Sequence, residues 1–348
     1  MRRRATGARL ALPTFRQATN ILAALRPRSS RRDDQRRRFQ RHLKTFWVVA
    51  KLPYEEGMGY AELLKIRLTG TVVLLVAAAV SHAASTEFER AEEQYQRANY
   101  KATLNLLLPL TSKDGAVYAL IGKAYYMDGQ YKGATNYLER AAAADVLNSS
   151  YYDWLGRAYG RRAEESSFVT ALPYANKTRA AFERAVALDP SNLEALSDLF
   201  EYYLQAPSIV GGGVDKAECI AARIRGLNEA EFHYSRARLA EKRKDRRTQE
   251  MELRQAMQLA PGQVGRIIDL AGFLSKQGRY AESDDLFRLA GQTKPDSPRV
   301  VLALAAAYVQ SGRNLEEAKM LLRQYASSQI TPDDPPRSEA ARLMKTLR

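Results

Sequence analysis

The sequence predicts an all-α protein: a right-handed α-solenoid of about seven helical hairpins with a capping helix at its C-terminal end. A motif returns every 34 residues near the C-terminus. A fixed period of this length is typical of stacked two-helix units rather than of one globular core. A bundle of helices that happen to be equally long would not place five identical pairs at one spacing. These pairs are Ala256 and Ala290, Pro261 and Pro295, Leu270 and Leu304, Ala271 and Ala305, and Gly278 and Gly312.

Small and large apolar residues keep fixed places within each unit. The spacing of three and four residues puts Ile121, Gly122 and Tyr125 on one face of a helix, and Gly129 then breaks that helix into a hairpin. Small residues on the shared face let the two helices touch, so Gly122 and Ala271 are expected at tight contacts. The units that keep the pattern best are 115–148, 264–297 and 298–331.

This pattern resembles the tetratricopeptide repeat of exported bacterial proteins, which has a 34-residue period and a closing proline. Weaker copies extend the resemblance over essentially all of residues 84–348. In that family the first helix of each hairpin lines a concave groove that holds a protein partner. The family's groove offsets carry over here to Lys123, Tyr126, Met127, Arg157, Arg161, Glu201, Tyr234, Arg238, Lys242, Ser275 and Lys276.

Three stretches depart from the period. Ten additional residues fall within Arg161–Lys177 and require either a loop or an extended helix, and Pro173 is expected to interrupt a helix there. The glycine-rich stretch Ala206–Gly213 reads as an inter-helix loop, after which Asp215 is expected to cap the next helix. The tail predicts a final helix over Ser338–Leu347 that covers the last repeat.

The positive charge of the chain is concentrated outside the repeats. The net charge is +15, but residues 1–57 alone hold 15 Lys or Arg and 4 Asp or Glu. Residues 84–348 hold 37 basic and 34 acidic residues, so the repeats are nearly neutral. A nucleic-acid binder would need a basic stripe on the repeats. We therefore expect no nucleic-acid partner. Several of the groove residues are cationic, with Tyr and Met among them, so the expected ligand is an acidic or extended protein segment.

Residues 58–83 have the three parts of a secretory signal peptide. A short basic region after Met58 precedes the apolar run Leu68–Val80, and small residues lead to a cleavage site after Ala83. The run holds 13 residues, which is short for a membrane span. This predicts cleaved export to the periplasm or medium, and an uncleaved anchor in the inner membrane is the alternative.

Residues 1–57 do not fit a signal peptide, because they precede its basic region. They are interpreted as an over-extended gene prediction whose true start is Met58, or as a basic disordered arm. A twin-arginine export signal at Arg36–Phe39 is disfavoured, because the apolar run begins nearly 30 residues further on.

Catalytic side chains are scarce in the repeats. Residues 84–348 contain one histidine, His233, and one cysteine, Cys219, so Ser-His-Asp, Cys-His and common zinc sites lack members. His233 is expected to pack between helices, and Cys219 to be a small buried residue. Gly211–Gly213 lacks the order of a phosphate-binding loop. The sequence predicts no catalytic site, cofactor, metal or small-molecule substrate.

The function predicted from these observations is a non-enzymatic protein-binding scaffold or adaptor of the bacterial cell envelope. The first alternative is a membrane-anchored assembly factor with the same repeats. The second is an enzyme or a nucleic-acid binder built on helical repeats.

Overall fold

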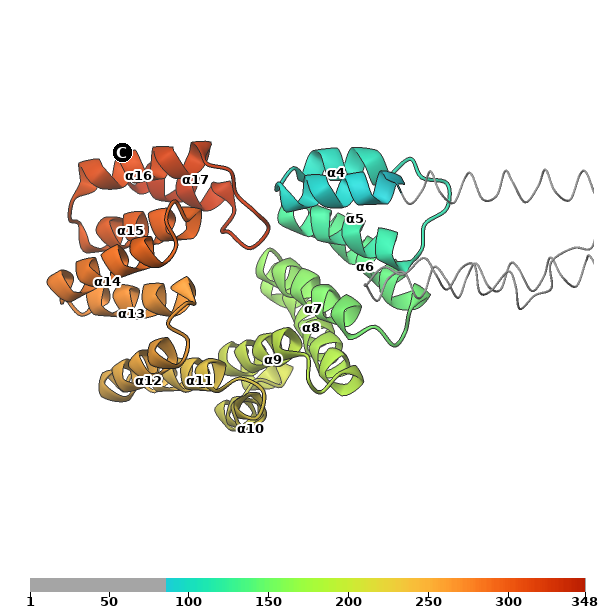
Figure 1. Cartoon of the computed structure of the whole chain (residues 1–348). Helices are drawn as coiled ribbons and strands as arrows, with labels where there is room; N and C mark the ends of the chain where they lie inside the picture. The colour runs from blue at the N-terminus through green and yellow to red at the C-terminus, as the bar shows by residue number, and fades with distance from the viewer. Residues whose placement is uncertain (1–85, 348) are drawn as a thin grey trace, which may run out of the picture. The chain divides into compact units, whose positions relative to one another are not determined.

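Helical hairpins follow one another along the chain in the computed structural model, which describes residues 86–347 (Figure 1). The first hairpin pairs helical residues 86–96 with α4 (Tyr100–Leu107). Six complete pairs follow before a last helix, α17 (Arg337–Thr346), and no strand occurs within the described residues. The pairs are α5 (Gly115–Met127) with α6 (Tyr131–Ala144), α7 (Ser149–Glu164) with α8 (Phe168–Leu188), α9 (Leu193–Gln205) with α10 (Val214–Arg225), α11 (Glu229–Lys242) with α12 (Arg246–Leu259), α13 (Val264–Lys276) with α14 (Tyr280–Thr293), and α15 (Pro298–Ser311) with α16 (Leu315–Ser327).

We call the first helices of these six pairs the A helices and their succession the A layer; α11 and α13 are the one successive pair in it without close backbone contact. The A helices are α5, α7, α9, α11, α13 and α15. The second helices, α6, α8, α10, α12, α14 and α16, are the B helices. Each A helix packs on its own B helix, and α5 also contacts α7, α7 contacts α9, α9 contacts α11, and α13 contacts α15. The prediction of an all-α solenoid of helical hairpins is therefore confirmed.

Short polar side chains begin six of the helices. In each case the side-chain oxygen of the residue before the helix accepts a hydrogen bond from a backbone N–H of the first turn, which would otherwise lack a partner. The residues are Asn99, Asp114, Asn148, Asn192, Asn228 and Asp245. Each of these helices therefore begins at the residue that follows its capping side chain.

In the hairpins α5–α6, α11–α12 and α13–α14, the turn between the A helix and its B helix passes through the left-handed region of backbone conformation. Gly129 and Gly278 both have φ of +77° there, and their N–H groups donate to a carbonyl three residues earlier. Lys244 stands at the same place between α11 and α12, with φ of +60° and the same backbone bond, 3.0 Å to Glu241 O. A side chain in this conformation costs on the order of 1 kcal/mol relative to glycine.

Two hairpins are closed by direct contact of a glycine with a large side chain. A Cβ added to Gly122 on α5 would lie 2.6 Å from Cγ of Leu138 on α6. A Cβ added to Gly156 on α7 would lie 2.5 Å from the ring of Phe182 on α8. The expected tight contact at Gly122 is present. Ala271 is likewise fully buried, and its carbonyl accepts a hydrogen bond from Ser283 Oγ on α14 at 2.8 Å.

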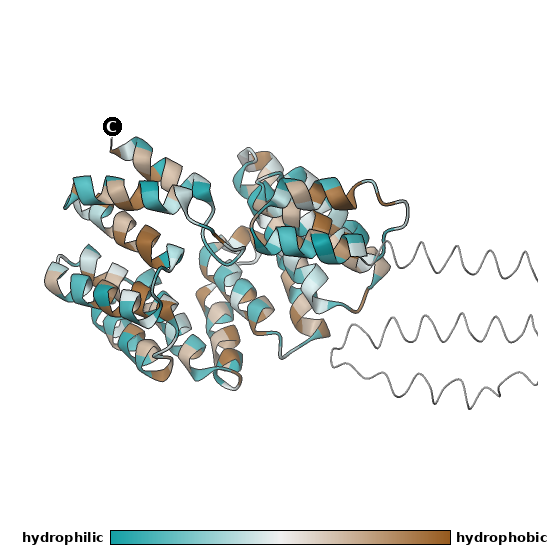
Figure 2. Ribbon diagram, turned by 45° about the horizontal axis from the view of Figure 1, so that its top comes forward, coloured by the Kyte–Doolittle hydropathy of each residue, from teal (hydrophilic) through white to brown (hydrophobic). Residues whose placement is uncertain are grey.

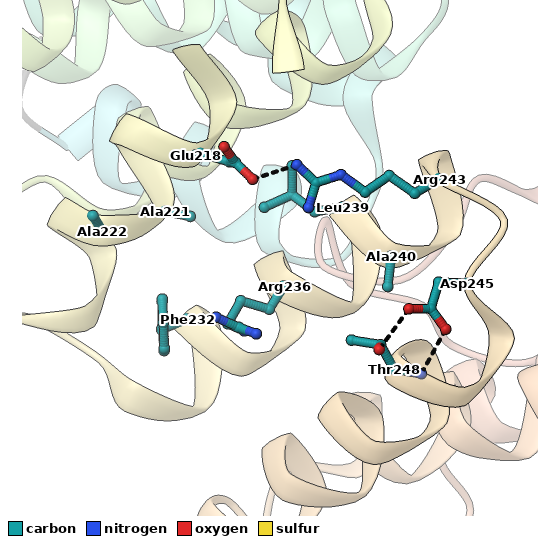
Figure 3. Close-up of a pocket in the computed structure, with 10 residues that line it drawn as sticks. All are labelled: Glu218, Ala221, Ala222, Phe232, Arg236, Leu239, Ala240, Arg243, Asp245 and Thr248. Atoms are coloured by element: carbon teal, nitrogen blue, oxygen red, sulfur yellow. Dashed lines mark hydrogen bonds and ion pairs between the residues drawn. The ribbon is translucent and has the colours of Figure 1, made fainter. Parts of the chain in front are cut away.

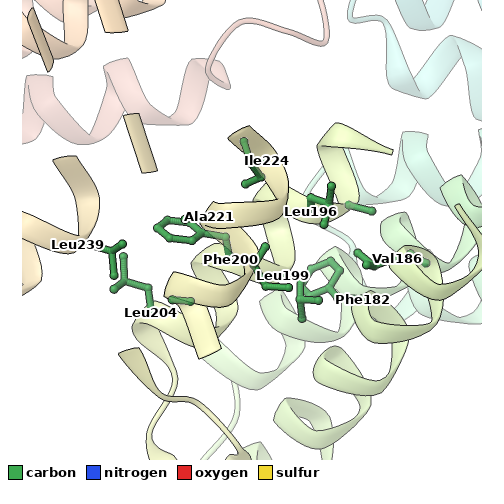
Figure 4. Packing of buried hydrophobic residues seen from close by; sticks show 13 residues of the cluster. Phe182, Val186, Leu196, Leu199, Phe200, Leu204, Ala221, Ile224 and Leu239 are labelled. Carbon is green, nitrogen blue, oxygen red and sulfur yellow. The ribbon is translucent and has the colours of Figure 1, made fainter. Parts of the chain in front are cut away.

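Buried apolar residues continue from one hairpin into the next. The largest cluster joins α8, α9, α10 and α11, and its centre is formed by Leu196, Phe200 and Ile224, each 2% exposed or less (Figure 4). Phe182 on α8 and Leu239 on α11 lie at its two ends. Hydrophilic residues are interspersed along the helices, so the described helices are not apolar all round (Figure 2).

The additional residues of the second complete hairpin lengthen its helices. α7 has 16 residues and α8 has 21, and Pro173 lies inside α8. The prediction that Pro173 interrupts a helix is therefore wrong. Residues close to the proline are fixed by packing on α7, because Arg162 lies 4.1 Å from the ring of Tyr174 and that ring stacks on Tyr159 at 6.3 Å. These contacts hold the first turns of α8 in a helix despite the missing N–H group.

The glycine-rich insertion is a folded turn. Residues Ser208–Val210 form a short 3-10 helix, η1, whose Val210 is buried, and the Tyr202 hydroxyl lies 2.8 Å from the Val210 carbonyl oxygen. A Cβ on Gly212 would lie 1.8 Å from the Ala206 carbonyl oxygen, so this close approach requires glycine. The following helix begins after Gly213, and Asp215 lies in its first turn, so the predicted cap at Asp215 is wrong.

The last helix covers the final hairpin close to where the sequence predicts it. α17 spans Arg337–Thr346, within a residue of the predicted bounds. Its Ala340 and Leu343 pack with Leu322 and Tyr325 of α16, and Tyr325 is fully buried. These contacts give the end of the array a closed apolar face.

The predicted extension 1–57 and signal peptide 58–83 lie outside the described residues. Within residues 86–347, none of the helices is both long and apolar enough to cross a bilayer.

Glycine contacts in the hairpins give a direct test of the packing. Gly122→Ala and Gly156→Ala should each lower the free energy of unfolding by about 1 to 3 kcal/mol, because the added methyl group must displace Leu138 or Phe182. Gly272→Ala on α13 is the control, since nothing lies within 4 Å of its added Cβ. Alanine there should be neutral or stabilising. Urea unfolding followed by circular dichroism measures all three, and equal effects would contradict this packing.

Candidate partner-binding face

Aromatic and cationic side chains meet on the N-terminal part of the A layer. Trp154 of α7 has Lys123 Nζ of α5 4.9 Å from its ring centroid and Arg157 Cζ 4.8 Å from it. The ring of Tyr126 meets Trp154 edge-on at 5.5 Å. Cations over an aromatic face are held by the ring's negative centre. We call Lys123, Tyr126, Tyr131, Trp154, Arg157 and Arg161 the Trp154 cluster.

The sixth member of this cluster, Arg161, projects from the last turn of α7. Its guanidinium lies 5.1 Å from the ring centroid of Tyr131 and donates a 3.1 Å hydrogen bond to the Tyr131 hydroxyl. It also pairs with Glu164 on the same helix. The side chain is 45% exposed, so its charge remains open to solvent beside the rings.

Arg157 is held by carboxylates of its own chain. It forms ion pairs with Asp153 at 3.1 Å, with Glu194 at 3.4 Å and with Asp198 of α9. The arginine is therefore a bridge between α7 and α9. Arg157 is thus not a free cation that could pair with an acidic ligand.

Asp153 is the most deeply buried carboxyl of this bridge. Its side chain is 2% exposed, and one of its oxygens has no hydrogen-bond partner within the described part of the chain. Burial raises the pKa of Asp153 well above 3.8; the Arg157 charge works against that rise, and the nearby Asp198 adds to it. Burial also raises the pKa of Asp198. A proton is therefore retained within this pair of carboxyls at pH values where an exposed aspartate has lost it.

Two further arginine–carboxylate bridges follow along the A layer. Arg238 of α11 donates two hydrogen bonds, 2.9 and 3.1 Å long, to the carboxylate of Glu201 on α9. Arg266 of α13 pairs with Glu231 of α11. Together with Arg157 and Asp198 these pairs link α7, α9, α11 and α13 in sequence, and we call them the ion-pair ladder.

A partly buried tyrosine lies beside the ladder. Arg266 Cζ is 4.1 Å from the ring centroid of Tyr234, and burial raises the pKa of that phenol. Asp269, which pairs with Arg266 at 3.2 Å, has its pKa raised to about 6, with burial as the main cause and Arg266 opposing it. The middle of the A layer is thus lined by charges that neutralise one another.

The structure brings the predicted groove residues together in two groups. Lys123, Tyr126, Arg157 and Arg161 belong to the Trp154 cluster, while Glu201, Tyr234 and Arg238 lie at the second bridge. Four others join neither group. Met127 packs into the apolar core of the first hairpins, Ser275 is buried on α13, and Lys242 and Lys276 are exposed at the last residues of α11 and α13.

Several residues of this face were missed by the sequence analysis. Trp154, Asp153, Asp198, Glu231 and Arg266 are not among the predicted groove residues. A signal for the ladder exists in the sequence. Two pairs are separated by 37 and 35 residues, close to the 34-residue period, and the third by 41 residues, because it spans the lengthened α7–α8 hairpin. Opposite charges at near-period spacing therefore indicate contacts between successive A helices.

His233 and Cys219 have different surroundings. His233 Nδ1 lies 2.6 Å from Oε2 of the buried Glu252, so it joins α11 to α12. Cys219 is exposed, and the expectation that it is buried is wrong. No group of three or more His, Cys, Asp or Glu residues that could hold a metal ion occurs in the described segment.

Solved structures with similar folds were found, although no protein-family profile and no curated protein matches the chain. A tetratricopeptide-repeat protein from Parabacteroides merdae superposes with a TM-score of 0.51 at 14% identity, covering 76% of this chain and 99% of that one. This chain has the tetratricopeptide-repeat fold. A thermophilic tetratricopeptide-repeat protein from Thermus thermophilus has a TM-score of 0.45 at 16% identity, covering 57% of this chain and 97% of that one.

Asp153 makes the stability of these repeats depend on pH. Its raised pKa means that the folded state keeps a proton that the unfolded chain releases near pH 4, so stability falls as the pH rises above about 4 towards the raised value. Asp153→Asn carries no titrating group and should flatten this part of the profile. Urea unfolding between about pH 4.5 and 8 measures the slope. Asp285→Asn, at an exposed carboxylate on α14, should keep the wild-type slope, and parallel profiles for all three proteins would refute the assignment.

Proposed function

We propose that this chain is a non-enzymatic scaffold of the bacterial cell envelope that holds an extended, acidic protein segment along the A layer. Helical repeats stack into long continuous faces, and such faces suit extended ligands because each repeat adds contacts. The near balance of basic and acidic residues in 84–348 disfavours a nucleic-acid partner.

The Trp154 cluster is the observation that carries this proposal. Partly exposed aromatic rings next to cations are typical anchors of protein interfaces, because a ring supplies apolar area and a cation pairs with an acidic side chain. Lys123 and Arg161 lie on either side of Tyr126 and Trp154, at neighbouring A helices. An acidic residue next to an apolar one on the partner would match this arrangement.

The ion-pair ladder has a different part in this proposal. Because Arg157 and Arg238 already bridge successive A helices, their charges fix the spacing of the layer. Reversing them would disturb folding and binding together. A test of the binding face must therefore use cations of the Trp154 cluster that do not belong to the ladder.

The location in the cell envelope rests on the leader at residues 58–83. Its basic region, apolar run and small residues before Ala84 favour export with cleavage. The alternative is a membrane-anchored assembly factor that keeps this leader and presents the same repeats outside the membrane.

Charge reversal in the Trp154 cluster should weaken partner capture. In Lys123→Glu/Arg161→Glu, the yield of crosslinked partner from the native cell envelope should fall about tenfold, because two attractive contacts become repulsive. Arg288→Glu on the B helix α14, at an exposed arginine, should leave capture unchanged. Circular dichroism and melting temperature should stay near those of the wild type. Undiminished capture by the double variant would argue against this face.

The mature N-terminus distinguishes the two locations. If the leader is cleaved, N-terminal sequencing of the protein from its native cell should begin at Ala84, in a fraction outside the inner membrane. A chain that retains Met58 in the membrane fraction would favour the anchored alternative. Protein that begins at Met1 in the cytosol would refute export.

A further inference from the structure

A cavity of about 300 Å³ lies between α10, α11 and the start of α12 (Figure 3). Its apolar lining comes from Ala221 and Ala222 of α10 and from Phe232, Leu239 and Ala240 of α11. None of its lining residues belongs to the Trp154 cluster or to the ion-pair ladder. We call this cavity the α10–α12 pocket.

The polar groups at the rim of the pocket already have partners. Arg243 pairs with Glu218 across the opening (Figure 3). The Asp245 carboxylate accepts a 3.1 Å hydrogen bond from Thr248 N and a 2.7 Å bond from Thr248 Oγ1. The space therefore offers an apolar surface under a satisfied polar rim. Such a site suits one apolar side chain of a ligand.

A concentrated positive charge adjoins the pocket at residues 242–247, which we call the basic turn. Its sequence is Lys-Arg-Lys-Asp-Arg-Arg, and all six residues are exposed. Arg243 has its partner in Glu218, but no described carboxylate forms an ion pair with Lys242, Lys244, Arg246 or Arg247. Asp245 is engaged at the start of α12. The turn thus presents cations to solvent beside an apolar recess.

Lys244 occupies a position that suits glycine. It has a left-handed backbone at the place where Gly129 and Gly278 stand in two other hairpins, and it makes the same turn hydrogen bond. A lysine here lowers the stability of the turn relative to glycine. Backbone strain of this kind is concentrated at functional sites. Ala98 has the same left-handed backbone and turn hydrogen bond in the first hairpin, so the conformation alone does not mark a site. At Lys244 this position adds a further cation to an already basic turn beside the pocket.

The basic turn could attract several kinds of anionic partner, and the apolar α10–α12 pocket beside it favours one of them. A bilayer accepts apolar side chains that protrude from a protein, whereas the apolar residues here line a cavity. Single strands of nucleic acid stack their bases on open aromatic rings. Residues 242–247 contain no aromatic residue, and the ring of Phe232 in the pocket already has Arg225 and Arg236 over it, at 5.3 and 5.8 Å from its centroid. An acidic protein segment matches both features, because its carboxylates face the cations and a neighbouring side chain fills the cavity.

We infer that the basic turn and the α10–α12 pocket together bind an acidic protein segment that inserts one apolar side chain between α10 and α11. This second docking site is separate from the A-layer face. Its success or failure therefore does not depend on the function proposed for that face.

Synthetic peptides test this inference with the full chain. One labelled probe consists of Glu and Asp with a single central Leu, and the matched probe has Ser in place of Leu. The Leu probe should bind about tenfold more tightly, a difference of about 1.4 kcal/mol, because its Leu side chain loses contact with water in the pocket. Fluorescence anisotropy at low and high salt measures both affinities, and the affinity should fall as salt screens the basic turn.

Variants separate the charge from the cavity. Lys244→Gly/Arg246→Gln/Arg247→Gln should weaken binding of both probes about tenfold or more at low salt. Lys244→Gly alone should weaken binding while it keeps or raises the melting temperature, since glycine relieves the left-handed backbone. Ala222→Phe, at an exposed residue of the pocket, should abolish the preference for Leu over Ser. Arg288→Gln is the control and should change neither the affinity for the two probes nor the preference for Leu over Ser.

Three results would overturn the inference. Equal affinities of the wild type for the Leu and Ser probes would show that the pocket takes no side chain. Undiminished binding by the triple variant would show that the cations do not contribute. Tighter binding to vesicles of phosphatidylglycerol, or to a single-stranded oligonucleotide, than to the Leu probe would assign the turn to a membrane or to nucleic acid.

Discussion

Close approach of the two helices within each hairpin is the constraint on which the rest of the structure depends. Gly122 faces Leu138, Gly156 faces Phe182, and the buried Ala271 lies against α14. Because only small side chains separate the two backbones, the helices of a hairpin lie close together and leave apolar side chains on both outer faces of the pair. Neighbouring hairpins must then stack to bury that surface, and their A helices form the A layer.

The A layer shows how charge is arranged when repeats stack. Arginines and carboxylates from successive A helices meet, so most of the charge in the middle of the layer is already neutralised. Burying Asp153 beside Arg157 and Asp198 leaves one carboxyl that favours its neutral form. What remains for a partner is an aromatic surface with cations at its edge, around Trp154. Specificity in such an interface depends on shape and on a few charges, and total charge matters less.

The repeat period predicts the architecture because it reflects packing that every unit must satisfy. Helix positions, the tight contact at Gly122 and the capping helix follow from that pattern. Local exceptions do not: Pro173 remains within α8 because α7 holds the surrounding residues, and α10 begins before Asp215 because the insertion folds back on Tyr202. Such outcomes depend on tertiary contacts that neighbouring residues in the sequence do not reveal.

The proposed binding face could be predicted only in part, because contacts between repeats are not visible in the sequence of one repeat. Family offsets place a residue on a helix face, and Lys123, Tyr126 and Arg161 lie together in the Trp154 cluster. The offsets do not indicate whether a charge meets an opposite charge from the next repeat, as Arg157 and Arg238 do. Nor do they draw attention to the turn at Lys244, which lies outside the groove positions of the family.

The order of charges along the ion-pair ladder restricts how this array can change in evolution. α7 offers an arginine to α9, α9 offers a carboxylate to α11, and α11 offers a carboxylate to α13. The α9–α11 and α11–α13 interfaces share one order of charges, a carboxylate followed by an arginine, whereas the α7–α9 interface has the reverse order. Removing the α9–α10 hairpin would take away Asp198 and Glu201, the carboxylates that pair with Arg157 and Arg238. This hairpin is therefore not interchangeable with its neighbours, although the backbones of the repeats are alike.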